Sequence, residues 1–238
     1  MNAGVDSSIR ERSPISGPLL FETGNERPLT TRRMLGTRYD ERSMPEPMIK
    51  GAIMRDCVVW YGERYGSDAL KQAAERLPDD VRAMLDIESP TFHLLGSLWY
   101  PARLVHAFLE ALARDRSATE MNRLLYDATR GLVKGGARQS VYRFFLERLV
   151  TPEIYAVCVP RFWRQLHSTG DRQVKIARRG YAESIVTNWP GHHPLLCTLT
   201  IETMSAVFET MGCKSVTWDR VACVSNGARE CKTLLSWR

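Results

Sequence analysis

The stretch that decides the fold covers residues 193–237 and reads HPLLCTLTIETMSAVFETMGCKSVTWDRVACVSNGARECKTLLSW. Its first part, Pro194 to Met211, predicts one helix, because proline is favoured in a first helical turn and Gly212 suits a helix end. Residues 214–223 then alternate like a strand, a Ser-Asn-Gly turn follows, and residues 230–237 predict a returning strand. A helix packed across a terminal hairpin is therefore the frame for the rest of the chain.

Upstream of this frame, apolar residues at helical spacing predict about seven helices from Met48 onward, followed by strands over 172–178 and 182–188. Helices first and strands later predict an α+β fold, with N-terminal helices packed on a C-terminal antiparallel sheet. Residues 1–47 hold five prolines, many charges and no sustained apolar period. We therefore expect this segment to be a disordered tail or docking segment, and residues 48–238 to form a single domain.

The bulk composition is that of an ordinary globular protein, with 44% hydrophobic residues, 25% charged residues and a net charge of +6. No apolar run approaches the roughly 18 residues of a membrane span, and the N-terminus lacks an apolar signal core. These features predict a cytoplasmic protein whose six cysteines are reduced thiols or ligands. The basic excess is densest over residues 161–180, which could meet phosphate or an acidic partner, although no motif for nucleic-acid binding accompanies it.

No catalytic pattern is present: the sequence has no G-x-S-x-G, no P-loop motif and no H-E-x-x-H. A dinucleotide fingerprint is also missing. The chain is therefore not expected to be an enzyme.

The cysteines of the terminal frame carry a family resemblance. Cys197, Cys223 and Cys231, with Gly227 between the last two and Trp237 near the end, resemble the end of a 4-vinyl reductase domain. The match continues upstream through Lys50-Gly51, Tyr65-Gly66, Leu77-Pro78, Trp99-Tyr100-Pro101 and Thr151-Pro152-Glu153-Ile154. Over residues 48–238 the chain is similar to an uncharacterised, chiefly myxobacterial family related to these domains.

The resemblance implies the fold shared by TRAPP subunits and heme-NO-binding-like sensors, and it implies a homodimer or another protein partner. In related phenol-sensing activators, such a domain holds a small aromatic molecule in an internal apolar pocket. Those sensors also bind zinc with three cysteines and a glutamate. Cys197, Cys223 and Cys231 match the cysteine positions, but Arg220 stands where the glutamate is expected.

Two interpretations of the three cysteines stay open. They could hold zinc, with His193 or Asp219 as a substitute fourth ligand, or they could be small buried apolar groups. No histidine is placed as an axial ligand, since His106 falls on a polar helix face and His93 and His167 are isolated, so heme is not expected. No cofactor is certain, and zinc is the candidate.

Aromatic residues from several predicted elements are the candidate lining of a ligand pocket. They are Trp99, Phe108, Tyr142, Phe145, Phe162, Trp189 and Phe208. The sequence thus predicts a non-enzymatic sensory or adaptor domain that binds a small apolar ligand. The alternative is a protein-interaction or scaffold module with a filled core, similar to a TRAPP dimer. A cavity would favour the first function, and a flat apolar outer face would favour the second.

Overall fold

The computed structural model describes residues 46–135 and 151–238. The predicted fold class is confirmed: helices precede and cover an antiparallel sheet, in an α+β arrangement. The helix predicted around residues 141–149 and the segment 1–45 lie outside the described residues. Residues 44–238 form one compact unit, and everything below concerns this unit.

The described chain begins with a short strand pair that the sequence did not predict. β1 (Met48–Lys50) pairs antiparallel with β2 (Trp99–Pro101). Gly51 follows at once and begins the first helix, in a place where a side chain would not fit. A Cβ atom there would lie 2.4 Å from the carbonyl oxygen of Leu95 and 2.6 Å from the ring of Tyr100. The Lys50-Gly51 step therefore lets the chain turn from strand into helix against the loop before β2.

The helices of the N-terminal part bury a common apolar face. They are α1 (Gly51–Tyr65), α2 (Ser67–Glu75), α3 (Asp79–Arg82), α4 (Ala102–Ala113) and α5 (Ala118–Gly135). α4 shows how the sequence fixes this packing, because Leu104, Val105, Phe108 and Leu112 are all nearly or fully inaccessible to water. Ser117 and Glu120 form the predicted capping box before α5, with the Glu120 carboxylate accepting from the Ser117 backbone N–H at 2.7 Å.

The C-terminal part is a four-stranded antiparallel sheet in the order β3-β4-β6-β5. β3 (Asp171–Arg178) and β4 (Tyr181–Thr187) form one hairpin, and β5 (Thr217–Ala222) and β6 (Cys231–Ser236) form the other. β4 pairs with β6, so the hairpins join through these strands. The 3₁₀ turn Val224–Asn226 and left-handed Gly227 (φ 83°) link the terminal strands.

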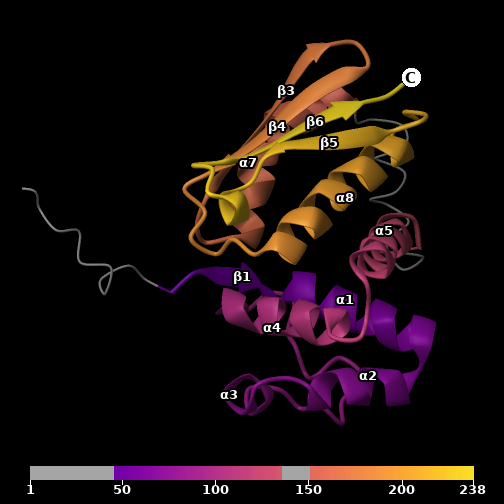
Figure 1. The fold of residues 1–238 in the computed structure, drawn as a ribbon, viewed down its shortest axis with the longest axis vertical. Coiled ribbons are helices and arrows are strands. Elements are labelled where there is room, and N and C mark those ends of the chain that lie inside the picture. Colours follow the sequence, from indigo (N-terminus) through magenta and orange to yellow (C-terminus); the bar gives the residue numbers. More distant parts are fainter. Residues whose placement is uncertain (1–45, 136–150) are drawn as a thin grey trace, which may run out of the picture. The chain divides into compact units, whose positions relative to one another are not determined.

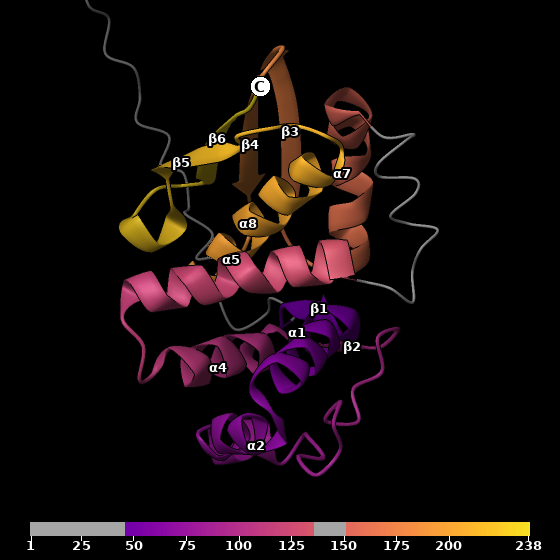
Figure 2. The ribbon, with the colours of Figure 1, turned by 90° about the vertical axis from the view of Figure 1, so that its right-hand side faces the viewer.

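Two helices cover one face of the sheet: α7 (Pro152–Leu166) and α8 (Pro194–Thr210) (Figures 1 and 2). A small core of buried residues fills the space between these helices and the strands. It consists of Val159, Val174, Ala182, Met204, Phe208 and Leu235. A larger core joins α1, α2, α4 and α5 to the N-terminal half of α8. α8 therefore belongs to both cores.

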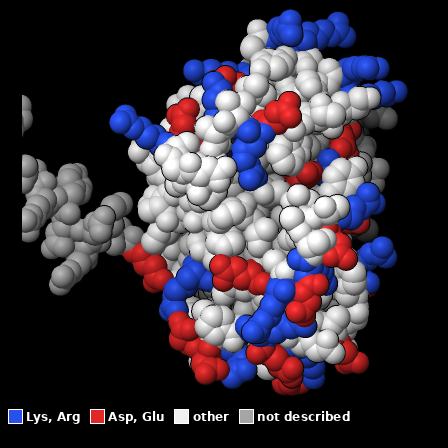
Figure 3. Space-filling model, viewed as in Figure 1, with Lys and Arg blue, Asp and Glu red and all other residues white. Residues whose placement is uncertain are grey.

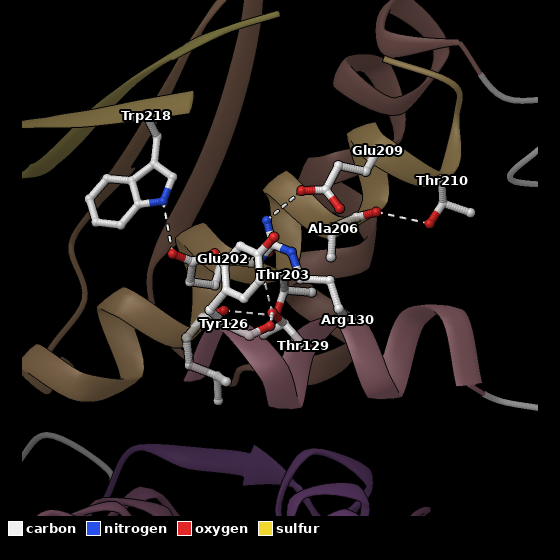
Figure 4. A network of polar contacts seen from close by, with 10 residues as sticks. Tyr126, Thr129, Arg130, Glu202, Thr203, Ala206, Glu209, Thr210 and Trp218 are labelled. Atoms are coloured by element: carbon white, nitrogen blue, oxygen red, sulfur yellow. Dashed lines mark hydrogen bonds and ion pairs between the residues drawn. The ribbon is translucent and has the colours of Figure 1, made fainter. Parts of the chain in front are cut away.

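A buried ion-pair network fixes α5 to α8 (Figure 4). The Arg130 guanidinium on α5 donates to the Glu202 carboxylate at 2.5 Å and to the Glu209 carboxylate at 2.6 Å. Trp218 of β5 donates its indole N–H to the other Glu202 oxygen at 3.0 Å. The side chains of Arg130 and Glu202 are only 10% and 9% exposed, so water screens this pair weakly. The network ties three elements together at one point.

The charged surface differs between the two parts of the unit. In the space-filling view, both signs alternate over the lower helices, and Lys and Arg gather at the upper end near the β3–β4 hairpin (Figure 3). Of the basic residues predicted to form a patch over 161–180, all but Arg172 are exposed. None of the helices in the described ranges is long and apolar enough to cross a membrane.

Candidate functional site

Helix α7 carries one wall of a largely apolar pocket. Thr151 caps the helix by accepting from the Ile154 N–H at 3.4 Å, and Pro152 occupies the first turn. The apolar side chains of α7 cover a broad part of the helix surface, and they do not all pack into the core. Val159 and Trp163 turn into the core, and other apolar side chains face α8 across a gap.

That gap is a pocket of about 430 Å³, called here the α7–α8 pocket. This volume lies in the range typical of small-molecule sites. Residues from α1, α7, β3 and α8 line it, together with His167, and nearly all are apolar. They are Ile53, Ile154, Tyr155, Cys158, Val159, Phe162, Trp163, Leu166, His167, Arg172, Leu196, Leu199, Thr200, Thr203 and Val207.

His167, the residue directly after α7, is one of the few polar groups at this pocket. Its ring stacks on Trp163 with centroids 3.9 Å apart and meets Trp189 edge to face at 5.7 Å. Burial, and then the charge of Arg172, lower the pKa of His167 to about 3, so the imidazole is neutral at physiological pH. Its buried Nδ1 has no hydrogen-bond partner among the described residues. An uncommitted, neutral imidazole nitrogen thus lies beside an apolar cavity.

Arg172 is the second unusual polar group of the pocket. It stands on β3 and is only 8% exposed, because strand alternation turns it to the same side as Val174. Its guanidinium donates from Nε to the Ser184 hydroxyl and from Nη2 to the Met204 sulfur, each at 3.3 Å. Both acceptors are neutral. No carboxylate pairs with Arg172 within residues 46–135 and 151–238.

The aromatic residues proposed from the sequence as pocket lining are placed at different points of the structure. Phe162 lines the pocket. Trp189 lies behind it, in edge contact with Trp163, and Phe208 is fully buried in the small core. Phe108 belongs to the helical core, and Trp99 is exposed on β2 beneath the Lys50 amine. Tyr142 and Phe145 lie outside the described residues.

The sequence analysis missed His167 and Arg172 as pocket residues. His167 was treated as isolated, and Arg172 as part of a basic surface patch. The available signal was the strand alternation over residues 171–176, which places Arg172 in phase with Val174 and Ile176.

The three cysteines of the terminal frame lie together at the other end of α8. Cys197 is on α8, Cys223 follows β5 and Cys231 begins β6, and all are buried. With the imidazole of His192, their sulfurs form a group of four ligand-type atoms within 4.8 Å of one another. The Cys223 and Cys231 sulfurs are 3.8 Å apart, and His192 Nε2 is 3.5 Å from the Cys223 sulfur. By donor type, this group could hold a metal ion.

Neither residue suggested as a fourth ligand belongs to the group of His192 and the three cysteines. His193 caps α8, accepting from the Leu195 N–H at 3.3 Å, and its other nitrogen lies 3.1 Å from Glu110. Asp219 is exposed on β5. The neighbouring His192 points to the cysteines instead, because the N-cap role turns His193 away.

Local charge and hydrogen bonding shape the protonation of the cysteine cluster. A hydrogen bond between Cys197 and Cys231 raises the pKa of Cys197 and lowers the pKa of Cys231. Burial lowers the pKa of His192. Arg220, at the position of the expected glutamate, donates to the Thr198 hydroxyl at 2.6 Å on α8. This cation acts electrostatically on Cys197 and His192.

Solved structures of similar fold are H-NOX domains. An H-NOX protein studied for its heme distortion has a TM-score of 0.57 and 9% identity, covering 80% of this chain and 95% of that one. The Fe(II) unliganded H-NOX protein from K. algicida has a TM-score of 0.55 and 12% identity, over 80% and 97%. An oxygen-binding H-NOX domain related to soluble guanylate cyclases, in its oxygen complex, gives 0.56 and 10%, over 80% and 95%.

No protein-family model and no curated protein matches the sequence. The structural neighbours correct the expectation about cofactors, which was none certain, with zinc as the candidate and heme not expected. They are heme proteins, so heme takes the place of zinc as the cofactor to weigh for this fold. Heme was not expected because the sequence alone placed no histidine as an axial ligand and treated His167 as isolated, whereas the structure places His167 among the residues that line the α7–α8 pocket. At identities of 9–12%, the likeness shows an H-NOX-like α+β fold.

Proposed function

We propose that residues 48–238 form a non-enzymatic sensory domain that binds a small apolar ligand in the α7–α8 pocket. The observation that carries this proposal is the apolar cavity of about 430 Å³, with the neutral His167 side chain among its lining residues. The H-NOX-like fold and the sequence resemblance to 4-vinyl reductase domains both support a ligand-binding role. The ligand would act by stabilising one arrangement of α7 and α8 relative to the sheet.

Heme is a candidate ligand of the α7–α8 pocket, because structural neighbours of this fold are heme proteins. The fit can be examined at His167, whose imidazole is neutral, buried and uncommitted at Nδ1. A neutral imidazole is the donor type of an axial histidine, and the apolar walls suit a macrocycle. The residues present therefore fit in donor type, with His167 as the group that would hold the iron. Bound heme would supply an iron site for a diatomic gas.

Titration of the purified protein with hemin, and separately with naphthalene and decan-1-ol, tests this function. Binding is measured by the melting temperature and, for hemin, by the Soret absorbance. A ligand at a hundredfold excess over its dissociation constant stabilises the folded state by about 2.7 kcal/mol. If the pocket is the site, Leu199→Trp, which fills it, abolishes the shift.

His167→Phe and His93→Asn separate axial ligation from simple apolar binding. The first keeps a ring against Trp163 but removes the nitrogen, and the second changes an exposed histidine elsewhere. We expect the Soret band of bound hemin to shift in His167→Phe only. Absence of any thermal shift with all three compounds would refute a ligand-binding pocket.

A protein-interaction module is the second candidate function, and one observation favours it. The surface of α7 exposes apolar side chains: Val157 is 81% exposed, and Ile154, which also lines the α7–α8 pocket, is 48% exposed. Such a face is typical of a contact with a partner chain. Sedimentation equilibrium of the wild type and of Val157→Asp tests it: a dimer that the substitution dissociates supports this function. The sensory and dimeric roles are compatible.

A further inference from the structure

We infer that the ligand of the α7–α8 pocket carries a carboxylate, which pairs with Arg172, so that the pocket is built for an apolar carboxylic acid. This inference rests on the proposed function, because it names the chemical class of the same ligand. It starts from a charge that the described protein leaves uncompensated.

A buried guanidinium without an acid is costly. Arg172 is 92% inaccessible to water by its 8% exposure, and its two hydrogen bonds go to a hydroxyl and a thioether. Burying an unpaired charge costs several kcal/mol in general, which is why buried arginines in proteins usually pair with carboxylates or phosphates. The remaining nitrogen, Nη1, has no hydrogen-bond partner in the part of the chain that the structure describes. Burial of the Arg172 cation at the wall of an otherwise apolar cavity therefore lowers the stability of the ligand-free fold.

The surroundings of Arg172 select the shape of its partner. The walls contributed by α7 and α8 are aliphatic and aromatic, so the body of the ligand must be apolar. Trp163, which also lines the pocket, lies beneath the guanidinium, with 5.9 Å from the guanidinium carbon to the ring centroid. His167 adds an unpartnered nitrogen at the same pocket. One cation and one neutral imidazole suit a single carboxylate better than a dianionic phosphate, which would require more compensating charge.

Matched acid and alcohol probes test the inference. Decanoate and decan-1-ol share an apolar body, and only decanoate is charged at pH 7.5. Isothermal titration calorimetry should show decanoate binding roughly tenfold or more tightly than decan-1-ol, the range expected for one charge-assisted hydrogen bond. Hemin and hemin dimethyl ester form a second pair, in which the ester lacks both carboxylates. A preference for hemin without binding of decanoate would assign the carboxylate to a macrocycle rather than to a free acid.

Variants on one strand locate the preference. Arg172→Met should abolish the preference for the acid, and Arg172→Lys should retain part of it, because the charge remains but the planar fork is lost. Arg178→Met is the matched control: it removes the same charge from an exposed site of β3 and should leave the preference intact. In the ligand-free protein, Arg172→Met should melt at an equal or higher temperature, since it relieves an uncompensated buried charge.

The outcomes distinguish failure of the carboxylate inference from failure of the proposed ligand-binding function. Equal binding of acid and alcohol by the wild type would overturn the carboxylate inference and leave the ligand-binding function standing. A lowered melting temperature in Arg172→Met with an unchanged acid preference would assign Arg172 a structural role and overturn the inference. Binding of none of the four probes would overturn the proposed function and the inference with it.

Discussion

At the residue scale, His167 makes the stability of the protein depend on pH. The pKa of a histidine is 6.5 in the unfolded reference and about 3 for His167 in the fold, where burial opposes its charge. Between these values the unfolded chain binds more protons, so the free energy of unfolding falls as the pH falls from about 6.5 towards 3. At pH 5 the difference is about 2 kcal/mol.

Chemical denaturation of wild type and His167→Phe between pH 7.5 and 5 measures this contribution. We expect the variant to lose less stability over that range, because its ring does not titrate. His93→Asn serves as the control and should keep the wild-type dependence, since that side chain is exposed in the fold. Identical pH profiles for wild type and His167→Phe would contradict the assignment.

A second residue-scale prediction concerns the cysteines. Cys223→Ser should destabilise the protein by about 1–3 kcal/mol, because a hydroxyl replaces a thiol in a site that is 1% exposed. Cys213→Ser should have a smaller effect, since Cys213 is only half buried, outside the cluster. Urea denaturation of the two variants gives the comparison, and an equal loss in both would mean that the cluster has no special packing.

The three cysteines of the cluster were predicted from the sequence, but the histidine beside them, His192, was not singled out from His193. Cys197, Cys223 and Cys231 could be brought together from a helix and a hairpin, because both elements have strong local signals. The choice between His192 and His193 depends on which imidazole caps α8, and that is decided by loop geometry. Likewise, nothing in the sequence around His167 separates a pocket histidine from a surface one.

At the scale of elements, the Arg130 network should dominate the coupling of α5 to α8. Arg130→Met leaves the buried Glu202 carboxylate without the cation that pairs with it, and we expect a loss of about 3–5 kcal/mol in unfolding free energy. Arg123→Met on the same helix breaks an exposed pair with Asp127 and should cost less than about 1 kcal/mol.

The double variant Arg130→Met with Glu202→Gln isolates the pairing itself. It should recover part of the lost stability, because the buried Glu202 carboxylate that lost its cation is neutralised. The measurement is guanidinium denaturation of Arg130→Met, Glu202→Gln and the double variant. Additive losses in the double variant would show that Arg130 and Glu202 act independently.

The bounds of the long helix α8 and of the strand β4 were predicted from the sequence to within about a residue, whereas the short strands β1 and β2 were not predicted. The helix expected over residues 194–211 is α8 (Pro194–Thr210), and the strand expected over 182–188 is β4 (Tyr181–Thr187). β1 and β2 were missed, because three residues cannot show a period and their pairing joins segments about fifty residues apart. The position of the α7–α8 pocket could not be predicted for a related reason. The apolar residues of α7 indicate that this helix has apolar surroundings, but they do not indicate whether side chains or a cavity lie against it.

At the scale of the whole molecule, we propose that residues 44–238 fold without the preceding segment. A chain that begins at Met44 keeps the Ala102 N–H bond to the Pro47 carbonyl at 2.8 Å and the ion pair of Arg103 with Glu46. Its melting temperature should lie within about 2 °C of the full chain, a change of less than 1 kcal/mol.

A chain that begins at Gly51 is the matched control. It loses β1 and with it Ile49, which is 2% exposed, so it should melt several degrees lower by calorimetry. Equal melting temperatures for both shortened chains would place the boundary of the domain later. A marked loss on starting at Met44 would show that residues 1–43 contribute to the fold.

The strand order β3-β4-β6-β5 has a consequence for synthesis on the ribosome. β6 is made after every other element of the sheet, yet it lies between β4 and β5 and is the strand with which β5 pairs. Until residues 231–236 have left the exit tunnel, β4 and β5 each present an unpaired edge, the kind of surface that invites contact with other nascent chains. The β3–β4 hairpin and the N-terminal helices can form before β6 is available, but the sheet closes only after β6 has joined β4 and β5, so a chaperone that shields β-edges would act during that interval.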